Sequence, residues 1–246
     1  MGHDPEHSFG GAHLKEIGPL LAAERELERR IAAGAADDAA GEGWTAALMF
    51  FHLAQWRGRL LAALCDVAQE RSYSAPPHDV DEVNDAELPA AQAVPLADAA
   101  VRSDAALGSL IKLWELLGER PFQWYAATTT SEALTRNSIL HARIHIASYL
   151  AEHGRRKEGD RLVEKTASEL RAVDAPPQIL GAALYNLAAA RAAQGHTGEA
   201  IALLEEAAPM RPDLGSYAID DRAFEALRDD PRFRALVGKG TEGQSR

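Results

Sequence analysis

Residues 44 to 71, WTAALMFFHLAQWRGRLLAALCDVAQER, decide the fold class of this chain. Large apolar side chains recur here every three or four residues, which is the spacing that places them on one face of an α-helix. That face consists of Met49, Leu53, Trp56, Leu60, Leu64 and Val67. We therefore expect a long helix that is buried along one side.

The same spacing continues along the chain, whereas valine, isoleucine and threonine are sparse and apolar residues do not alternate with polar ones. We expect further long helices at about residues 12–33, 96–118 and 131–153, and hence an all-α fold in which four long helices form a bundle. Residues 72–95 hold four prolines and an acidic run, which predicts a loop or lid instead of a long helix.

Composition excludes several classes of function. The 246 residues are 46% hydrophobic and carry a formal net charge of -11, which is typical of a globular protein that repels nucleic acid and anionic membranes. Cys65 is the single cysteine, so an intrachain disulfide and a CxxC site are excluded. Since no apolar run is long enough for a signal peptide or a membrane span, we expect a cytoplasmic protein.

The helices become shorter after the polar stretch GRRKEGD at residues 154–160. We therefore expect two domains, a bundle over residues 1–157 and a second helical region over residues 158–246. Within the second region, residues 181–214 resemble a tetratricopeptide repeat, with Gly195 at the turn between its two helices. One repeat is complete, so residues 158–174 are expected to supply a degenerate preceding helix.

Small residues of this repeat stand where two antiparallel helices approach each other, and Arg191 departs from the aromatic residue usual at its position. The residues that match the repeat are Leu184, Leu187, Ala188, Gly195, Ala200, Leu204, Ala207 and Pro212. The segment DDRAFEALRDDPRFRALV at residues 220–237 resembles the short helical cap of such regions. The repeat indicates either a docking surface for a protein or a layer that stabilises the rest of the chain.

Three histidines are the candidates for a metal site. His141 and His145 are four residues apart, so a helix places both imidazoles on one face, and His52 lies on the border of the apolar face of residues 44–71. Three imidazoles leave coordination positions open, as catalytic zinc sites do, and they also suit nickel, iron and copper. Solvated histidines on the expected helix over residues 131–153 and a hydrogen-bonded His52 would produce the same pattern.

The segments FFHLAQWRGRLL at residues 50–61 and NSILHARIHIASYL at residues 137–150 resemble the DinB-like (DinB/YfiT) superfamily over about residues 10–155. The resemblance implies a four-helix bundle that binds a divalent metal, zinc or nickel, through His52, His141 and His145. It also implies a metal-activated thiolate or water that attacks a small-molecule substrate, as in thiol S-transferases, with a low-molecular-weight thiol as cosubstrate. A hydrolase is the related possibility.

A non-catalytic interaction module is the alternative, in which the repeat docks a partner protein and the metal is structural or vestigial. The two hypotheses differ in what removal of His141 does to activity. Asn137 could orient an imidazole, although an exposed capping or solvated role is the stronger expectation. Helical bundles often pair through their long faces, so we also expect a homodimer.

Overall fold

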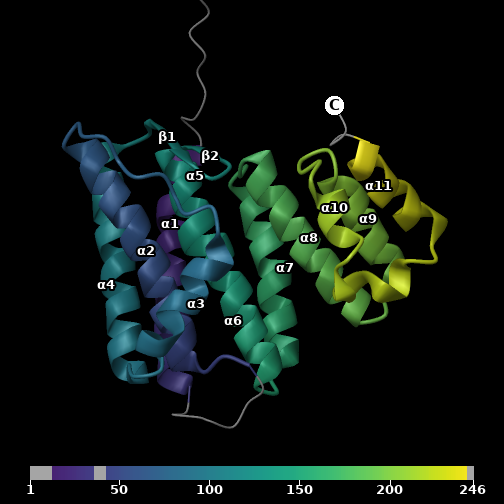
Figure 1. Ribbon diagram of the computed structural model, residues 1–246, viewed down its shortest axis with the longest axis horizontal. Coiled ribbons are helices and arrows are strands. Elements are labelled where there is room, and N and C mark those ends of the chain that lie inside the picture. Colours follow the sequence, from purple (N-terminus) through teal and green to yellow (C-terminus); the bar gives the residue numbers. More distant parts are fainter. Residues whose placement is uncertain (1–12, 36–42, 243–246) are drawn as a thin grey trace, which may run out of the picture. The chain divides into compact units, whose positions relative to one another are not determined.

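The structure is a computed structural model that describes residues 13–35 and 43–242 (Figure 1). The described residues are overwhelmingly helical, with one small two-stranded sheet, which confirms the all-α prediction. Their contacts divide the chain into two compact units. Unit 1 comprises residues 1–38 and 46–139, and unit 2 comprises residues 39–45 and 140–246.

Unit 1 contains three long helices, in agreement with the predicted ranges, although residue 12 lies outside the described residues. They are α1 (His13–Gly34), α2 (Ala46–Ala68) and α4 (Leu96–Leu117). Helix α4 packs along α2 and also contacts α1 (Figure 1). Met49, Leu53, Trp56, Leu60 and Leu64 of the predicted face are buried, so the 3-4 pattern correctly identified the side of α2 that is covered. Val67 is only half-buried.

The prediction of a loop or lid over residues 72–95 is wrong for its central part, which forms helix α3 (Val80–Ala91). The Asp79 carboxylate accepts a hydrogen bond from the Glu82 backbone N–H at 2.8 Å and thereby caps the helix. Pro89 lies in the last turn of α3, so the backbone hydrogen bond that it cannot donate is lost near the end of the helix. A side-chain bond from Trp56 Nε1 to Asn84 Oδ1, 3.1 Å long, anchors α3 to α2.

The connection after α4 is a short hairpin that the sequence did not predict. Strand β1 (Pro121–Trp124) pairs antiparallel with β2 (Ala127–Thr129), and Tyr125 adopts a φ of 52° at the turn between them. Phe122 and Trp124 are both buried, so this connection contributes aromatic side chains to the core.

The predicted helix over residues 131–153 consists of three consecutive segments. They are α5 (Thr130–Thr135), a π-helical turn (Arg136–Leu140) and α6 (His141–Glu152). The wider π-helical turn changes the rotation of the side chains that follow it, which a constant 3.6-residue period cannot anticipate. The boundary between the two units falls within this turn.

Unit 2 continues from α6 with antiparallel helices of moderate length. They are α7 (Arg156–Ala172), α8 (Pro177–Ala193), α9 (Thr197–Ala207), α10 (Leu214–Ala218), a 3-10 helix (Arg222–Leu227) and α11 (Pro231–Glu242). Neighbours in sequence pack side by side from α6 to α9 (Figure 1). A Cβ at Gly159 would stand 2.7 Å from the Ala147 carbonyl oxygen, so glycine is needed for the close approach of α7 to α6.

The predicted pair of helices around Gly195 is present as α8 and α9, and Gly195 has the positive φ of 80° that the turn requires. Part of the core of unit 2 is built largely from small and branched side chains. Its members are Ala188, Ala192, Ala200, Ile201, Leu204, Ala218, Phe224, Leu227, Phe233 and Val237. The boundary expected at residue 157 and the tetratricopeptide resemblance stay predictions.

Among the described residues, the helices lack the combination of length and apolarity that crossing a membrane requires.

Candidate metal centre

Helix α6 positions two of the predicted ligands. His141 and His145 lie on the same face because they are one helical turn apart. Neighbouring positions Ala142, Ile146 and Ala147 are buried in the core. Packing of these apolar residues therefore fixes the rotation of α6, and with it the direction of both imidazoles.

The two imidazoles face each other. Their Nε2 atoms are 3.1 Å apart, and the rings meet edge to face with centroids 4.6 Å apart. Both side chains are half-buried. A pair of neutral imidazoles can make this contact when one Nε2–H donates to the other ring.

Trp44 stacks on the imidazole of His145. Its indole lies parallel to the His145 ring, with an interplanar angle of 2° and centroids 5.2 Å apart. Trp44 also belongs to unit 2 and is half-buried. A flat aromatic wall of this kind restricts rotation of the imidazole about its side-chain bonds.

Burial lowers the pKa of His145 to about 4. Desolvation disfavours the imidazolium, so the ring is neutral at pH 7 and a nitrogen lone pair is available. Metal ligation requires this neutral form.

His52 lies in unit 1, on α2, and it is buried with 5% of its surface exposed. Its ring is tilted against that of Trp56 at a centroid distance of 6.1 Å. Trp56 in turn contacts the guanidinium of Arg59 at 4.9 Å and the Tyr125 ring at 6.5 Å. The prediction placed His52 on the border of the apolar face, and the structure places it inside the covered surface.

Asn137 does not have the exposed role that was the stronger expectation. It is buried, and its Nδ2 donates to the Trp56 carbonyl oxygen at 3.3 Å while its Oδ1 accepts from Ser138 Oγ at 3.2 Å. Asn137 therefore ties the π-helical turn to α2 within unit 1.

The donor set suits a transition metal. Two nitrogens that are each about 2.0–2.1 Å from a tetrahedral zinc lie about 3.3 Å apart. The Nε2 atoms of His141 and His145 have nearly this separation. Among the described residues, His141 and His145 of unit 2 and His52 of unit 1 each offer one ring nitrogen that is a possible metal ligand.

Two features of this region could not be predicted from the sequence. Trp44 is the first residue of the predicted helix over residues 44–71, directly after a glycine-rich stretch, and it gives no periodic signal that would link it to His145. The π-helical turn directly before His141 likewise has no signature in its residues, RNSIL. Irregular turns of this type are frequent at functional sites.

Comparison of the chain with protein families, with curated proteins and with solved structures found no match.

Proposed function

We propose that this chain binds a divalent transition metal, zinc or nickel, with His52, His141 and His145 as its ligands. The observation that carries the proposal is the pair of facing Nε2 atoms of His141 and His145, 3.1 Å apart on one helix face. Their separation matches two ligands of one ion, and the low pKa of His145 keeps that ring in the form that ligates.

Imidazole ligands point to a transition metal because carboxylate and carbonyl oxygens are the usual ligands of magnesium and calcium. With three protein ligands, coordination positions remain for water or a substrate. Trp44 and the buried residues of α6 would keep the two imidazoles in place before the ion arrives. Such preorganisation reduces the entropy lost on binding.

The reaction we propose is nucleophilic attack on a small molecule by a thiol or water, of the thiol S-transferase or hydrolase type. A bound divalent ion would supply Lewis acidity that lowers the pKa of the nucleophile into the neutral range. A low-molecular-weight thiol is the proposed cosubstrate. The DinB-like resemblance of residues 50–61 and 137–150 supports this choice.

An interaction module is the second candidate, and a hollow in unit 2 favours it. This hollow has a volume of about 270 Å³ and is lined by α6, α7 and α8, with alanines 183, 189, 190 and 193 along the α8 side. Small side chains leave room for a segment of a partner protein. Under this hypothesis the metal would be structural or vestigial.

Elemental analysis tests metal binding directly. Protein purified without a tag, chelator or metal-affinity resin should contain about one equivalent of a transition metal per chain. The double variant His141→Ala, His145→Ala should contain none, and His52→Ala should lose most of it. His196→Ala is the matched control because His196 is exposed and precedes α9, and its metal content should equal that of the wild type.

A wild-type protein that contains no metal, and that takes up none on titration with Zn²⁺ or Ni²⁺, would refute the site. Retention of the metal by the double variant would show that other residues bind it. Activity with thiols and electrophiles that His141→Ala abolishes would support the enzyme, whereas unchanged partner binding in that variant would support the interaction module.

A further inference from the structure

Unit 1 contains a hollow that is built from other residues than the metal centre. Its volume is about 400 Å³, and it opens between α1 and α4 with a wall from α2. We call it the α1–α4 pocket. Its charged lining is Arg25, Glu28, Arg29 and Asp104, and its apolar lining includes Phe50 and Val101. Small-molecule sites have volumes of roughly 300–1,000 Å³, so the pocket is large enough for a compact ligand.

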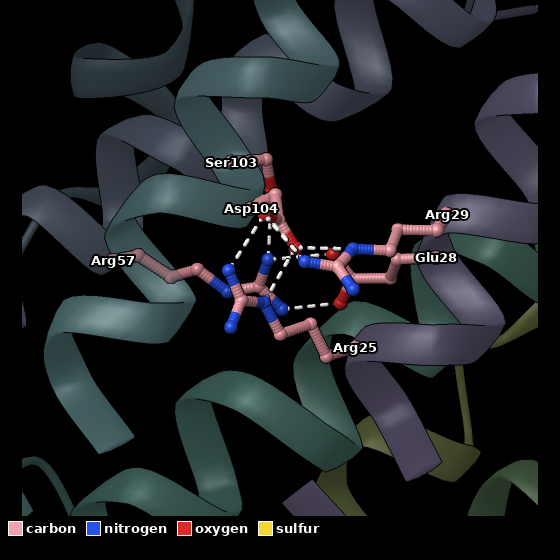
Figure 2. A network of polar contacts seen from close by, with 6 residues as sticks. All are labelled: Arg25, Glu28, Arg29, Arg57, Ser103 and Asp104. Carbon is pink, nitrogen blue, oxygen red and sulfur yellow. Dashed lines mark hydrogen bonds and ion pairs between the residues drawn. The ribbon is translucent and has the colours of Figure 1, made fainter. Parts of the chain in front are cut away.

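Two arginines of the pocket converge on one carboxylate (Figure 2). Arg25 and Arg29 are one turn apart on α1, and each directs Nε and one terminal nitrogen at the two oxygens of Asp104 on α4. The four nitrogen–oxygen distances range from 2.6 to 3.1 Å. The hydrogen bond from Arg25 and the charges of both arginines lower the pKa of Asp104 to about 2.

The carboxylate of Glu28 is hydrogen-bonded to a third arginine, Arg57. Its two oxygens accept hydrogen bonds from Arg57 of α2, and the side chains of this pair are 5% and 1% exposed. Arg57 also donates to Ser103 Oγ at 2.7 Å (Figure 2). Glu28 is thus hydrogen-bonded to Arg57, whereas Asp104 receives the hydrogen bonds of both Arg25 and Arg29 at the pocket.

The arginines keep donor capacity beyond Asp104. A guanidinium carries five N–H groups, and two from each arginine are directed at the Asp104 oxygens. The side chain of Arg29 is 53% exposed, so its remaining groups are within reach of a solute. Gly108 lacks the Cβ that would stand 3.0 Å from Arg25, and the space it leaves accommodates that guanidinium.

The other side of the pocket is apolar. Val101 is 68% exposed although it is a large hydrophobic residue, and it lines the pocket together with Phe50 and with alanines 32, 100 and 105. Exposed apolar side chains beside converging cationic donors are typical of sites that bind an amphipathic small molecule.

We propose that the α1–α4 pocket binds a small organic anion, a carboxylate joined to a compact apolar body. The carboxylate accepts hydrogen bonds from Arg29 and Arg25, in the planar geometry that guanidinium prefers. The apolar body lies against Val101, Phe50 and the alanines. This binding is independent of the histidines and does not rest on the proposed metal.

Isothermal titration calorimetry with three small molecules tests the charged side and the apolar side of the pocket separately. Benzoate combines a carboxylate with an apolar ring, benzamide has nearly the same shape without the charge, and acetate has the charge without the ring. A cavity of about 150 Å³ accommodates benzene, so the ring of benzoate fits. We expect saturable binding of benzoate with a Kd near or below about 1 mM, and binding of benzamide and acetate at least about tenfold weaker.

Two variants locate the binding. Arg29→Gln removes the exposed guanidinium and should weaken benzoate at least about tenfold, because it deletes a charge-assisted hydrogen bond. Arg30→Gln is the matched control, since Arg30 is the next residue on α1, is exposed and does not line the pocket. It should bind benzoate as the wild type does.

Equal affinity for benzoate and benzamide would overturn the anion site, and equal affinity for benzoate and acetate would overturn its apolar half. Unchanged benzoate binding in Arg29→Gln, or the absence of saturable binding to the wild type, would overturn the proposal as a whole. The probe series uses the unaltered protein, so the test does not depend on the stability of the variant.

Discussion

Each unit contains a buried arginine that is paired with a glutamate, and the two pairs differ in the surroundings of the acid. In unit 1, Arg57 and Glu28 have side chains that are 1% and 5% exposed. In unit 2, Arg143 is 2% exposed, but its partner Glu169 is 29% exposed. A charge that keeps contact with water loses less hydration free energy, so the second pair costs less to form and less to break.

The two units also differ in how their helices pack. Unit 1 buries large side chains such as Phe50, Trp56, Trp114 and Trp124. Unit 2 brings its backbones close together through small residues, as Gly159 against Ala147 shows. Unit 1 thus contains a fully buried ion pair, whereas unit 2 contains a close contact between two helix backbones.

The largest effect is expected for Glu28→Gln. This substitution removes the carboxylate that is hydrogen-bonded to the buried Arg57, which should lower the free energy of unfolding by about 3–5 kcal/mol. Urea denaturation followed by circular dichroism measures the change. Glu26→Gln is the control, because Glu26 pairs with Arg30 on the exposed surface of the same helix and should cost under about 1 kcal/mol. Equal losses of unfolding free energy in Glu28→Gln and Glu26→Gln would show that burial does not make the Glu28–Arg57 pair more important than an exposed pair.

Gly159→Ala should have the next largest effect. The added Cβ meets the Ala147 carbonyl oxygen, a backbone atom that cannot move aside cheaply, and the cost of such overpacking is about 1–3 kcal/mol. Gly198→Ala on α9 is the matched control, because no atom lies within 4 Å of its Cβ. Gly198 is the second residue of α9, so alanine should leave the free energy of unfolding unchanged or slightly higher. Stabilisation by both substitutions would show that α6 and α7 do not need the glycine.

Glu169→Gln should cost about 1 kcal/mol, clearly less than Glu28→Gln. Arg143 is buried, but Glu169 remains in contact with water and also pairs with Lys165, so the ion pair is partly screened. The same urea titration measures both variants. A loss as large as that of Glu28→Gln would mean that the exposure of the acid does not determine the strength of these pairs.

The smallest expected effect is the pH dependence contributed by Asp104. Its pKa falls from 3.8 to about 2 on folding, first through the hydrogen bond from Arg25. A lowered carboxyl pKa stabilises the folded protein above pH 3.8, and this contribution disappears as the pH falls toward 2. Wild type and Asp104→Asn should therefore differ in unfolding free energy at pH 6, and the difference should shrink over that acidic window. A difference that is constant with pH would contradict the assignment.

Local sequence patterns predicted much of the helical structure. The bounds of α1, α2 and α4 and the buried face of α2 follow from apolar residues three and four positions apart. The pairing of His141 with His145 follows from the same period, because both lie on one helix. The prolines of residues 72–95 favour a loop, yet helix α3 forms between them, with Asp79 as its cap and Pro89 in its last turn.

The amino-acid sequence by itself determined the helical class of the protein, the covered side of its helices and the alignment of two imidazoles. These properties depend on neighbours within one or two turns, where the geometry of the α-helix leaves little choice. Only the tertiary structure decided that Glu28 meets Arg57, that Asp104 meets Arg25 and Arg29, and that Trp44 stacks on His145. Such partners are far apart in sequence, and their meeting depends on the packing of whole helices, which no local period encodes.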